Sequence, residues 1–298
     1  MKFYNSECFQ INNDDLKIHL KKIIGNEYFF GPQPISIERK HFKELYSNDY
    51  YISKKADGQR YLLCLLTFND KNIALFIDRK FDMFMVKFKF PKECFKDTLI
   101  DGEMITKNNQ TYFLCFDCLK FSGKSLLNFC FSERIKHMQV LIKNYKHSNE
   151  DSCILYLKEF LLYKQIVPPF KDTWYDTDGY VFMPEKNEIT FGTHNHFFKW
   201  KPLLENTIDF IINNDYKLCL NKNSLISKTL NNIQFTNIEK KDIIVNKIYE
   251  CKYIKEKVWS PIILRHDKTI PNSYYVYQKT LLNIKENIQE SEFFNKNI

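Results

Sequence analysis

The chain has 298 residues and a mass of 36.0 kDa, a length that is typical of two domains. Hydrophobic residues make up 44% of it, which excludes a wholly disordered chain. Lys and Arg together number 44 against 36 Asp and Glu, and the resulting net charge of +8 favours a polyanionic partner.

The first predicted element is an amphipathic helix over residues 14–24, which Asp14 or Asp15 can cap and Gly25 can end. A strand-rich region follows, in which short aromatic or β-branched runs are separated by polar turns. The predicted strands are 50–53, 60–68, 73–78, 81–90, 99–105 and 112–117.

A second helix is predicted over 132–144, and strands resume near 179–183 and 196–199. After Pro202 the pattern changes to short strands joined by Asn-, Lys- and Ser-rich loops. These strands are predicted at 207–212, 216–220, 242–253 and 274–277, with a final helix over 280–297. This order predicts a small β-barrel that follows a larger α+β domain.

The nine cysteines are odd in number and scattered, and several lie in apolar runs, which indicates reduced, buried thiols in an intracellular protein. Cys115 and Cys118 form one CxxC pair without a second pair or a His at zinc spacing, so we expect no metal or redox role for them. The first residues do not resemble a signal peptide, and no apolar run reaches the roughly 18 residues of a membrane span. We therefore expect a chain that is not secreted.

Three of the seven glycines directly follow an aspartate, at Asp57-Gly58, Asp101-Gly102 and Asp178-Gly179. Asp-Gly is common in hairpin turns, and that is the structural interpretation. The flanking residues favour a chemical one, because Lys55 and Arg60 bracket the first pair between two apolar strands. Together these segments supply one candidate nucleophile, carboxylates for a divalent ion, and cations for phosphates.

In their order along the chain, these segments resemble the motifs of the covalent nucleotidyltransferases, the superfamily of mRNA capping guanylyltransferases and ATP-dependent ligases. Lys55-x-Asp57-Gly58-x-Arg60 looks like the first motif. Four later segments resemble the later motifs in the same order: Asp101-Gly102-Glu103, Phe116-Asp117, Asp178-Gly179 and Lys199-x-Lys201. Near the end, Trp259 and Arg265-His266-Asp267-Lys268-x-x-Pro271-Asn272 resemble the last motif in its capping-enzyme form, and the flanking segments are similar to the chlorella virus members.

The resemblance implies a chemical role for each matching residue. Lys55 would attack the α-phosphate of GTP and form a lysyl-N-GMP intermediate. Glu103 and Asp178 would hold Mg²⁺ or Mn²⁺, while Arg60, Arg79 and Glu103 would contact the ribose and the neighbouring phosphate. Phe116 would stack on guanine, which Lys158 would read. The phosphate contacts would come from Lys199 and Lys201 at the α-phosphate, and from Arg265, Asp267 and Lys268 at the β- and γ-phosphates.

The fold implied is α+β: a ligase-type (ATP-grasp-like) nucleotidyltransferase domain, residues 1–202, and an OB-fold β-barrel, residues 203–278. A C-terminal helix, residues 279–298, would pack back on the first domain. Arg265, Asp267 and Lys268 could then reach the nucleotide only by domain closure.

The function implied is that of an mRNA guanylyltransferase, which transfers GMP to a 5′-diphosphate RNA end and forms the GpppN cap. GTP is the expected substrate, and a separate RNA triphosphatase and a separate cap methyltransferase are the expected partners. The expected location is the cytoplasm or nucleus, which includes the cytoplasm or nucleus of a virus-infected host cell. A ligase with the same lysine chemistry is the first alternative, and Pro271-Asn272 argues against it. A catalytically inert subunit that binds RNA or another enzyme is the second, and the intact Lys55, Glu103 and Asp178 argue against that.

Overall fold

The structure is a computed structural model that describes residues 2–3, 6–7, 9–25, 31–166, 172–266 and 268–294. The chain forms two compact units. The N-terminal unit contains Met1–Ile35 and Glu44–Lys199, and the C-terminal unit contains Ser36–Lys43 and Trp200–Ile298. Residues 36–43 therefore belong to the unit that is formed mainly by the end of the chain.

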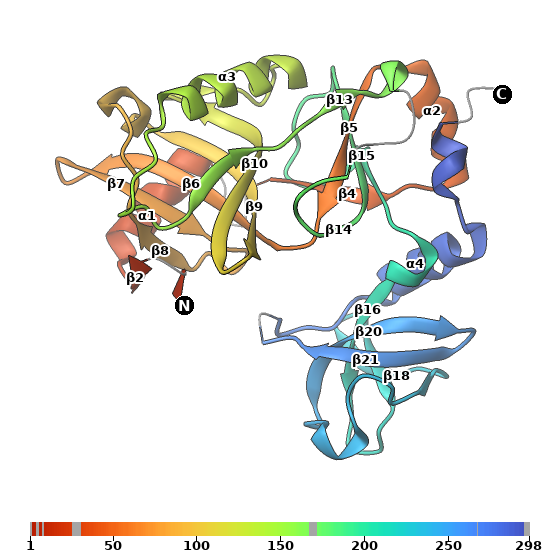
Figure 1. Cartoon of the computed structure of the whole chain (residues 1–298). Coiled ribbons are helices and arrows are strands. Elements are labelled where there is room, and N and C mark those ends of the chain that lie inside the picture. The colour runs from red at the N-terminus through yellow and green to blue at the C-terminus, as the bar shows by residue number, and fades with distance from the viewer. Residues whose placement is uncertain are drawn as a thin grey trace. The chain divides into compact units, whose positions relative to one another are not determined.

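An eight-stranded sheet forms most of the N-terminal unit (Figure 1). Its strand order is β11-β10-β9-β6-β7-β8-β3, and β12 pairs in parallel with β10. The strands are β3 (Phe9–Ile11), β6 (Gln59–Phe68), β7 (Lys71–Ile77), β8 (Met83–Val86), β9 (Thr98–Lys107), β10 (Gln110–Phe121), β11 (Lys124–Ser125) and β12 (Ile154–Leu157). A two-stranded sheet of β1 (Lys2–Phe3) and β2 (Ser6–Glu7) lies at the N-terminus.

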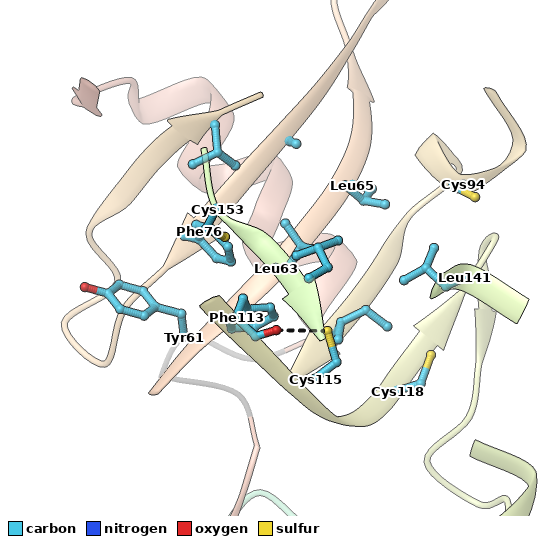
Figure 2. Packing of buried hydrophobic residues seen from close by; sticks show 14 of the residues in the cluster. Tyr61, Leu63, Leu65, Phe76, Cys94, Phe113, Cys115, Cys118, Leu141 and Cys153 are labelled. Carbon is cyan, nitrogen blue, oxygen red and sulfur yellow. Dashed lines mark hydrogen bonds between the residues drawn. The ribbon is translucent and has the colours of Figure 1, made fainter. Parts of the chain in front are cut away.

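Strand β6 is buried on both faces, because successive side chains of a strand point to opposite sides. Leu62, Cys64 and Leu66 belong to a cluster that includes Leu16 and Leu20 of α1 (Asp14–Ile24). Figure 2 shows the other cluster, in which Leu63 and Leu65 pack with Phe113 and with Leu141 of α3 (Phe131–Asn144). The two helices thus cover opposite faces of the sheet.

Helix α1 has the predicted bounds, and Gly25 ends it with a left-handed φ of 75°. The predicted cap was wrong by one residue. Asn13, not Asp14 or Asp15, caps the helix: its side chain accepts a hydrogen bond from the Leu16 amide at 2.9 Å. An Asp in the first turn instead stabilises the positive end of the helix dipole.

The second sheet of the N-terminal unit has five strands in the order β13-β5-β14-β15-β4. They are β4 (Pro32–Ser36), β5 (Tyr50–Ala56), β13 (Leu161–Leu162), β14 (Thr177–Pro184) and β15 (Gly192–Trp200), and the short helix α2 (Phe42–Ser47) precedes β5. β5 leads into β6 of the other sheet through two residues, Asp57 and Gly58. The sheets are therefore joined at the predicted nucleophile motif.

The C-terminal unit contains a six-stranded sheet in the order β18-β17-β16-β20-β21-β19. Its strands are β16 (Thr207–Ile212), β17 (Leu218–Lys222), β18 (Leu225–Lys228), β19 (Asn232–Ile233), β20 (Lys247–Lys255) and β21 (Val258–Leu264). Trp259 and Phe210 are buried at its centre. This β-rich unit is consistent with the expected OB-fold, and the predicted α+β class is confirmed.

The strand predicted at 274–277 is wrong, because these residues form the first turn of helix α4 (Tyr274–Glu286). Ser273 caps this helix by accepting a hydrogen bond from the Val276 amide at 3.2 Å. The aromatic run favours a strand by propensity, but the cap starts a helix. Helix α4 also contacts residues 36–43, which belong to the same unit. Lys279 Nζ donates to Glu38 at 2.7 Å, and Asn283 Nδ2 donates to the Ile37 carbonyl at 2.7 Å.

The eight cysteines that the structure describes are all free thiols, and seven of them are buried; Cys8 lies outside the described residues. In the described part of the chain, no helix has the length and apolar character needed to span a membrane.

Candidate active site

The link from β5 to β6 places Lys55 and Arg60 at the ends of two adjoining strands. The Asp57 amide donates to the Asp176 carbonyl at 3.1 Å, which ties this link to the start of β14. Gly58 is required by space, since a Cβ there would lie 2.3 Å from the Met104 carbonyl oxygen. The Asp-Gly pair is therefore a close crossing between two sheets and not a hairpin turn.

Lys55 forms an ion pair with Asp178 across neighbouring strands of the five-stranded sheet. Its Nζ donates to both carboxylate oxygens of Asp178, at 2.8 and 3.0 Å. The register of β14 with β5 shifts between Thr177 and Tyr180, and Gly179 has a φ of 142° there. Asp178 lies in this irregular stretch, where its carboxylate contacts Lys55. The predicted nucleophile and one predicted metal ligand are thus in direct contact.

On the other sheet, Asp101 and Glu103 of β9 share one face because they are two residues apart. Arg60 lies opposite Glu103 in the register and binds Asp101 in a bidentate pair, in which Nε donates at 2.8 Å and Nη2 donates to the second oxygen. Burial raises the pKa of Asp101, and the charge of Arg60 opposes this shift. Gly102 points to the opposite face, where a Cβ would overlap the Phe113 ring.

Phe116 is the additional residue of a β-bulge, because the register of β10 with β9 shifts between Cys115 and Asp117. Its ring lies partly exposed near two cations, with the Arg60 Cζ 5.5 Å and the Lys158 Nζ 5.9 Å from its centroid. Phe116 is therefore part of the charged site and is not a residue of the hydrophobic core.

The bulge is held by a buried ion pair between Asp117 and Arg134 of α3. The Arg134 Nε and Nη2 donate to the two oxygens of Asp117 at 2.7 and 3.1 Å, and its Nη1 donates to the Phe129 carbonyl at 2.7 Å. Arg134 is not part of any of the predicted motifs. The signal was available, since an Arg within the apolar pattern of a helix needs a buried partner.

Glu103 lies where the charges of both sheets converge. Burial raises its pKa, and the cations of Lys55, Lys158, Arg60 and Arg79 oppose this shift. Among the residues that the structure describes, no side chain donates a hydrogen bond to its carboxylate. Five predicted site residues, from β5, β6 and β9 and from the segments after β7 and β12, are thus close enough to interact electrostatically.

Lys158 is buried directly after β12, where its amide donates to the Cys115 carbonyl at 2.9 Å. Burial lowers its pKa to about 8, against the attraction of Glu103, while the charge of Lys55 adds to the lowering. A buried lysine beside an aromatic ring can donate a hydrogen bond to a carbonyl oxygen of a bound base. The structure thus places Lys158 in the same site as Phe116.

The other predicted site residues lie at the end of the N-terminal unit and in the C-terminal unit. Lys199 lies on β15, which neighbours β14, the strand that carries Asp178. Lys201 follows β15 and belongs to the C-terminal unit. Asp267 lies outside the described residues.

Arg265 and Lys268 converge on the buried Asp209 of the C-terminal unit. The Arg265 Nη1 lies 3.1 Å from Asp209 Oδ1 and 3.2 Å from Glu250 Oε2, and the Lys268 Nζ donates to Asp209 Oδ2. Asn272 supports this arrangement, since its Oδ1 accepts from the Asp209 amide at 2.8 Å. Asp209 and Glu250 were missed in the sequence, because each is an ordinary polar position of a strand.

A divalent cation would find two protein carboxylates here, Glu103 and Asp178. In the described ranges, no group of three or more His, Cys, Asp or Glu side chains could hold a metal ion. Two carboxylates fit Mg²⁺ or Mn²⁺, which take their other ligands from water and substrate phosphates. They do not fit a closed structural metal site.

The sequence matches the family model of the mRNA capping enzyme catalytic domain over residues 6–203, and that of the mRNA capping enzyme C-terminal domain over residues 205–294. The mRNA-capping enzyme subunit alpha of Neurospora crassa is 31% identical over 235 residues, which cover 66% of this chain and 58% of the relative. That of Yarrowia lipolytica is 24% identical over 313 residues, covering 88% and 80%.

The chain spans less than two thirds of the first relatives, 58% of the Neurospora protein and 57% of the subunit alpha of Schizosaccharomyces pombe. Among solved structures, a mycobacterial DNA ligase D complexed with ATP and MES is 13% identical, with 74% of this chain and 90% of that chain covered. Its TM-score of 0.43 is too low to support an argument about function. Because the two capping-enzyme models together match nearly the whole sequence, the chain belongs to the mRNA capping enzyme family.

Proposed function

We propose that this chain is an mRNA guanylyltransferase, which transfers GMP from GTP through a covalent Lys55 intermediate to the 5′-diphosphate end of RNA. The observation that carries the proposal is the position of Lys55. Its ammonium is paired with Asp178 and lies close to Glu103, at the junction of two sheets that also supplies Arg60, Arg79 and Lys158. A nucleophilic amine among phosphate-binding cations is the arrangement that nucleotidyl transfer to lysine requires.

In the first step, the lone pair of the deprotonated Lys55 Nζ attacks the α-phosphorus of GTP. A nitrogen–phosphorus bond forms, the bond between the α-phosphorus and the bridging oxygen breaks, and pyrophosphate leaves with the electron pair. Asp178 is the neighbouring base that can take the lysine proton, since it already accepts the hydrogen bonds of this amine.

In the second step, an oxygen of the RNA β-phosphate attacks the same phosphorus and Lys55 leaves as an amine, which takes up a proton. The contacts to the α-phosphate serve both steps, because each step is an in-line displacement at the same phosphorus. Glu103 and Asp178 are the proposed ligands of Mg²⁺ or Mn²⁺, which would neutralise charge on the phosphate oxygens.

The other contacts follow from where the side chains lie. Phe116 offers a partly exposed ring for stacking on guanine, and the buried Lys158 is the proposed donor to its O6. Arg60 and Arg79 are the proposed ribose and phosphate contacts, and Lys199 and Lys201 the α-phosphate contacts. Arg265, Asp267 and Lys268 of the C-terminal unit are proposed to align the pyrophosphate.

An ATP-dependent ligase remains the competing function, since it would use the same lysine chemistry. The matches to both capping-enzyme models support capping. Within this proposal, the RNA triphosphatase and the cap methyltransferase are separate proteins. The chain would act in the cytoplasm or nucleus, in a virus-infected cell if the protein is viral.

The test is incubation with GTP or ATP that carries a labelled α-phosphate, with Mg²⁺ or Mn²⁺, followed by denaturing electrophoresis. We expect a covalent label from GTP and none from ATP. A label from ATP alone would establish the ligase, and no label from either nucleotide would indicate an inert subunit.

A further inference from the structure

Four aromatic side chains form a cluster beside the nucleophile motif that the proposed GTP site does not use. Trp174 is at its centre, with ring centroids 4.5 Å from Tyr112, 5.3 Å from Tyr156 and 5.3 Å from Tyr175. Tyr112 and Tyr156 come from the neighbouring strands β10 and β12, and the other two from the segment before β14. We propose that Trp174 and Tyr156 form a stacking platform for an unpaired base near the 5′ end of the acceptor RNA.

The exposure within the cluster divides it into an anchor and a platform. Tyr175 is 6% exposed and packs with Ala56, Ile105 and Leu114, so this residue holds the segment in place. Trp174 is 39% and Tyr156 38% exposed. Covering exposed aromatic surface is favourable, and a nucleobase is a flat partner that stacks on aromatic rings in any sequence.

The cluster also lies close to the nucleophile motif. Thr177 pairs with Ala56, next to Lys55, and Trp174 precedes Thr177 by three residues. Its Cα is therefore at most about 11 Å along the chain from that of Thr177. Lys107 also lies here, but its Nζ is paired with Asp176 Oδ1 at 2.8 Å, so an RNA phosphate would have to replace this carboxylate.

This inference rests on the proposed function for the identity of the ligand, but its first test, a fluorescence titration, does not. The chain has three tryptophans, and the other two, Trp200 at 8% and Trp259 at 0% exposure, are buried. A base that stacks on Trp174 should therefore quench most of the solvent-accessible tryptophan fluorescence. The probe is a single-stranded RNA of five nucleotides with a 5′-diphosphate, titrated at low salt without GTP.

We expect saturable quenching in the wild-type protein and in Trp200→Phe, and its loss in Trp174→Phe. A blunt duplex of the same sequence should quench weakly, because its bases are already stacked. With the isolated lysyl-GMP form, Trp174→Ala should raise the KM for the RNA about 5- to 150-fold, which corresponds to the loss of one stacked base, and Tyr156→Ala should raise it less. The yield of the covalent adduct from GTP should not change in these variants.

Quenching that persists in Trp174→Phe, or an unchanged KM in Trp174→Ala, would overturn the platform. The same holds for a Trp174→Ala protein that loses adduct formation together with transfer, since that result indicates a structural role. Quenching by RNA in a protein that forms no adduct with GTP would support the platform and refute the guanylyltransferase, so the two failures are distinguishable.

Discussion

The Lys55 Nζ is held by both oxygens of Asp178, whereas the neighbouring Lys54 donates to the Tyr180 hydroxyl at 3.1 Å and lies over the Tyr180 ring. Adjacent residues of a strand point to opposite faces, so only one of these two lysines can enter the site. If Asp178 is a ligand of the metal ion, as proposed above, the metal has to compete with Lys55 for this carboxylate.

The first prediction concerns this choice of lysine. Lys55→Ala should abolish the covalent GMP adduct, and Lys54→Ala, the matched control, should keep most of it. The measurement is the amount of labelled protein after denaturing electrophoresis, together with the mass of the modified peptide. An adduct that maps to Lys54 would contradict the assignment.

The second prediction concerns the base. Phe116→Ala should raise the GTP concentration needed for half-maximal adduct formation by the loss of one stacking contact, about 1–3 kcal/mol, and Phe116→Tyr should change it little. The melting temperature of each variant serves as the control for folding. If the GTP dependence of Phe116→Ala equals that of the wild type, the ring does not contact guanine.

The third prediction separates the two chemical steps. Arg265 and Lys268 are proposed to align pyrophosphate, which is present only while the adduct forms. Arg265→Ala and Lys268→Ala should therefore slow adduct formation far more than transfer of GMP from the isolated adduct to diphosphate-ended RNA. The residual adduct from long incubations supplies the material for the second assay.

Both cations contact Asp209, so either substitution can also destabilise the C-terminal unit. The two rates are therefore compared within the same variant protein, because a smaller fraction of folded protein lowers both rates equally. Variants in which RNA transfer is the more impaired step would show that these residues bind RNA.

The fourth prediction is a pH dependence of stability. The pKa of Lys158 is lowered to about 8 in the folded chain, against an ordinary value near 10.5. Between these values the unfolded chain binds more protons, so the free energy of unfolding should rise with pH over this window, by about 3 kcal/mol at most. The measurement is urea unfolding at pH 7.5, 9 and 10.

Lys158→Met removes the titrating group. The free energy of unfolding of the wild type minus that of this variant therefore isolates the contribution of Lys158 from that of other groups. A difference that stays constant from pH 7.5 to 10 would mean that Lys158 keeps its ordinary pKa in the folded chain.

The fifth prediction concerns the pair that holds the Phe116 bulge. Arg134→Met leaves the Asp117 carboxylate buried without its cation and should cost about 3–5 kcal/mol of stability, measured by urea unfolding. Adding Asp117→Asn should recover part of this loss, because the lone charge is removed. A single variant that loses less than about 1 kcal/mol would show that water reaches Asp117.

Much of the site could be predicted from the sequence, because the chemistry depends on short motifs. Lys55, Arg60, Glu103 and Phe116 were predicted on this basis, and they lie close together in the structure. Local rules also predicted α1, since an apolar period and a terminal Gly act over a few residues. They failed at residues 274–277, where a single capping serine outweighed the strand propensity of the aromatic side chains.

What only the tertiary structure decided are the partners of buried charges. Nothing near Asp117 in the sequence indicates Arg134, and nothing near Arg265 indicates Asp209, because the partners are 17 and 56 residues away. The residues around Trp174 likewise come from two strands and a loop. A motif specifies which groups are available within a few residues of one another, whereas burial and long-range pairing depend on how separate segments pack, and packing is a property of the folded chain as a whole.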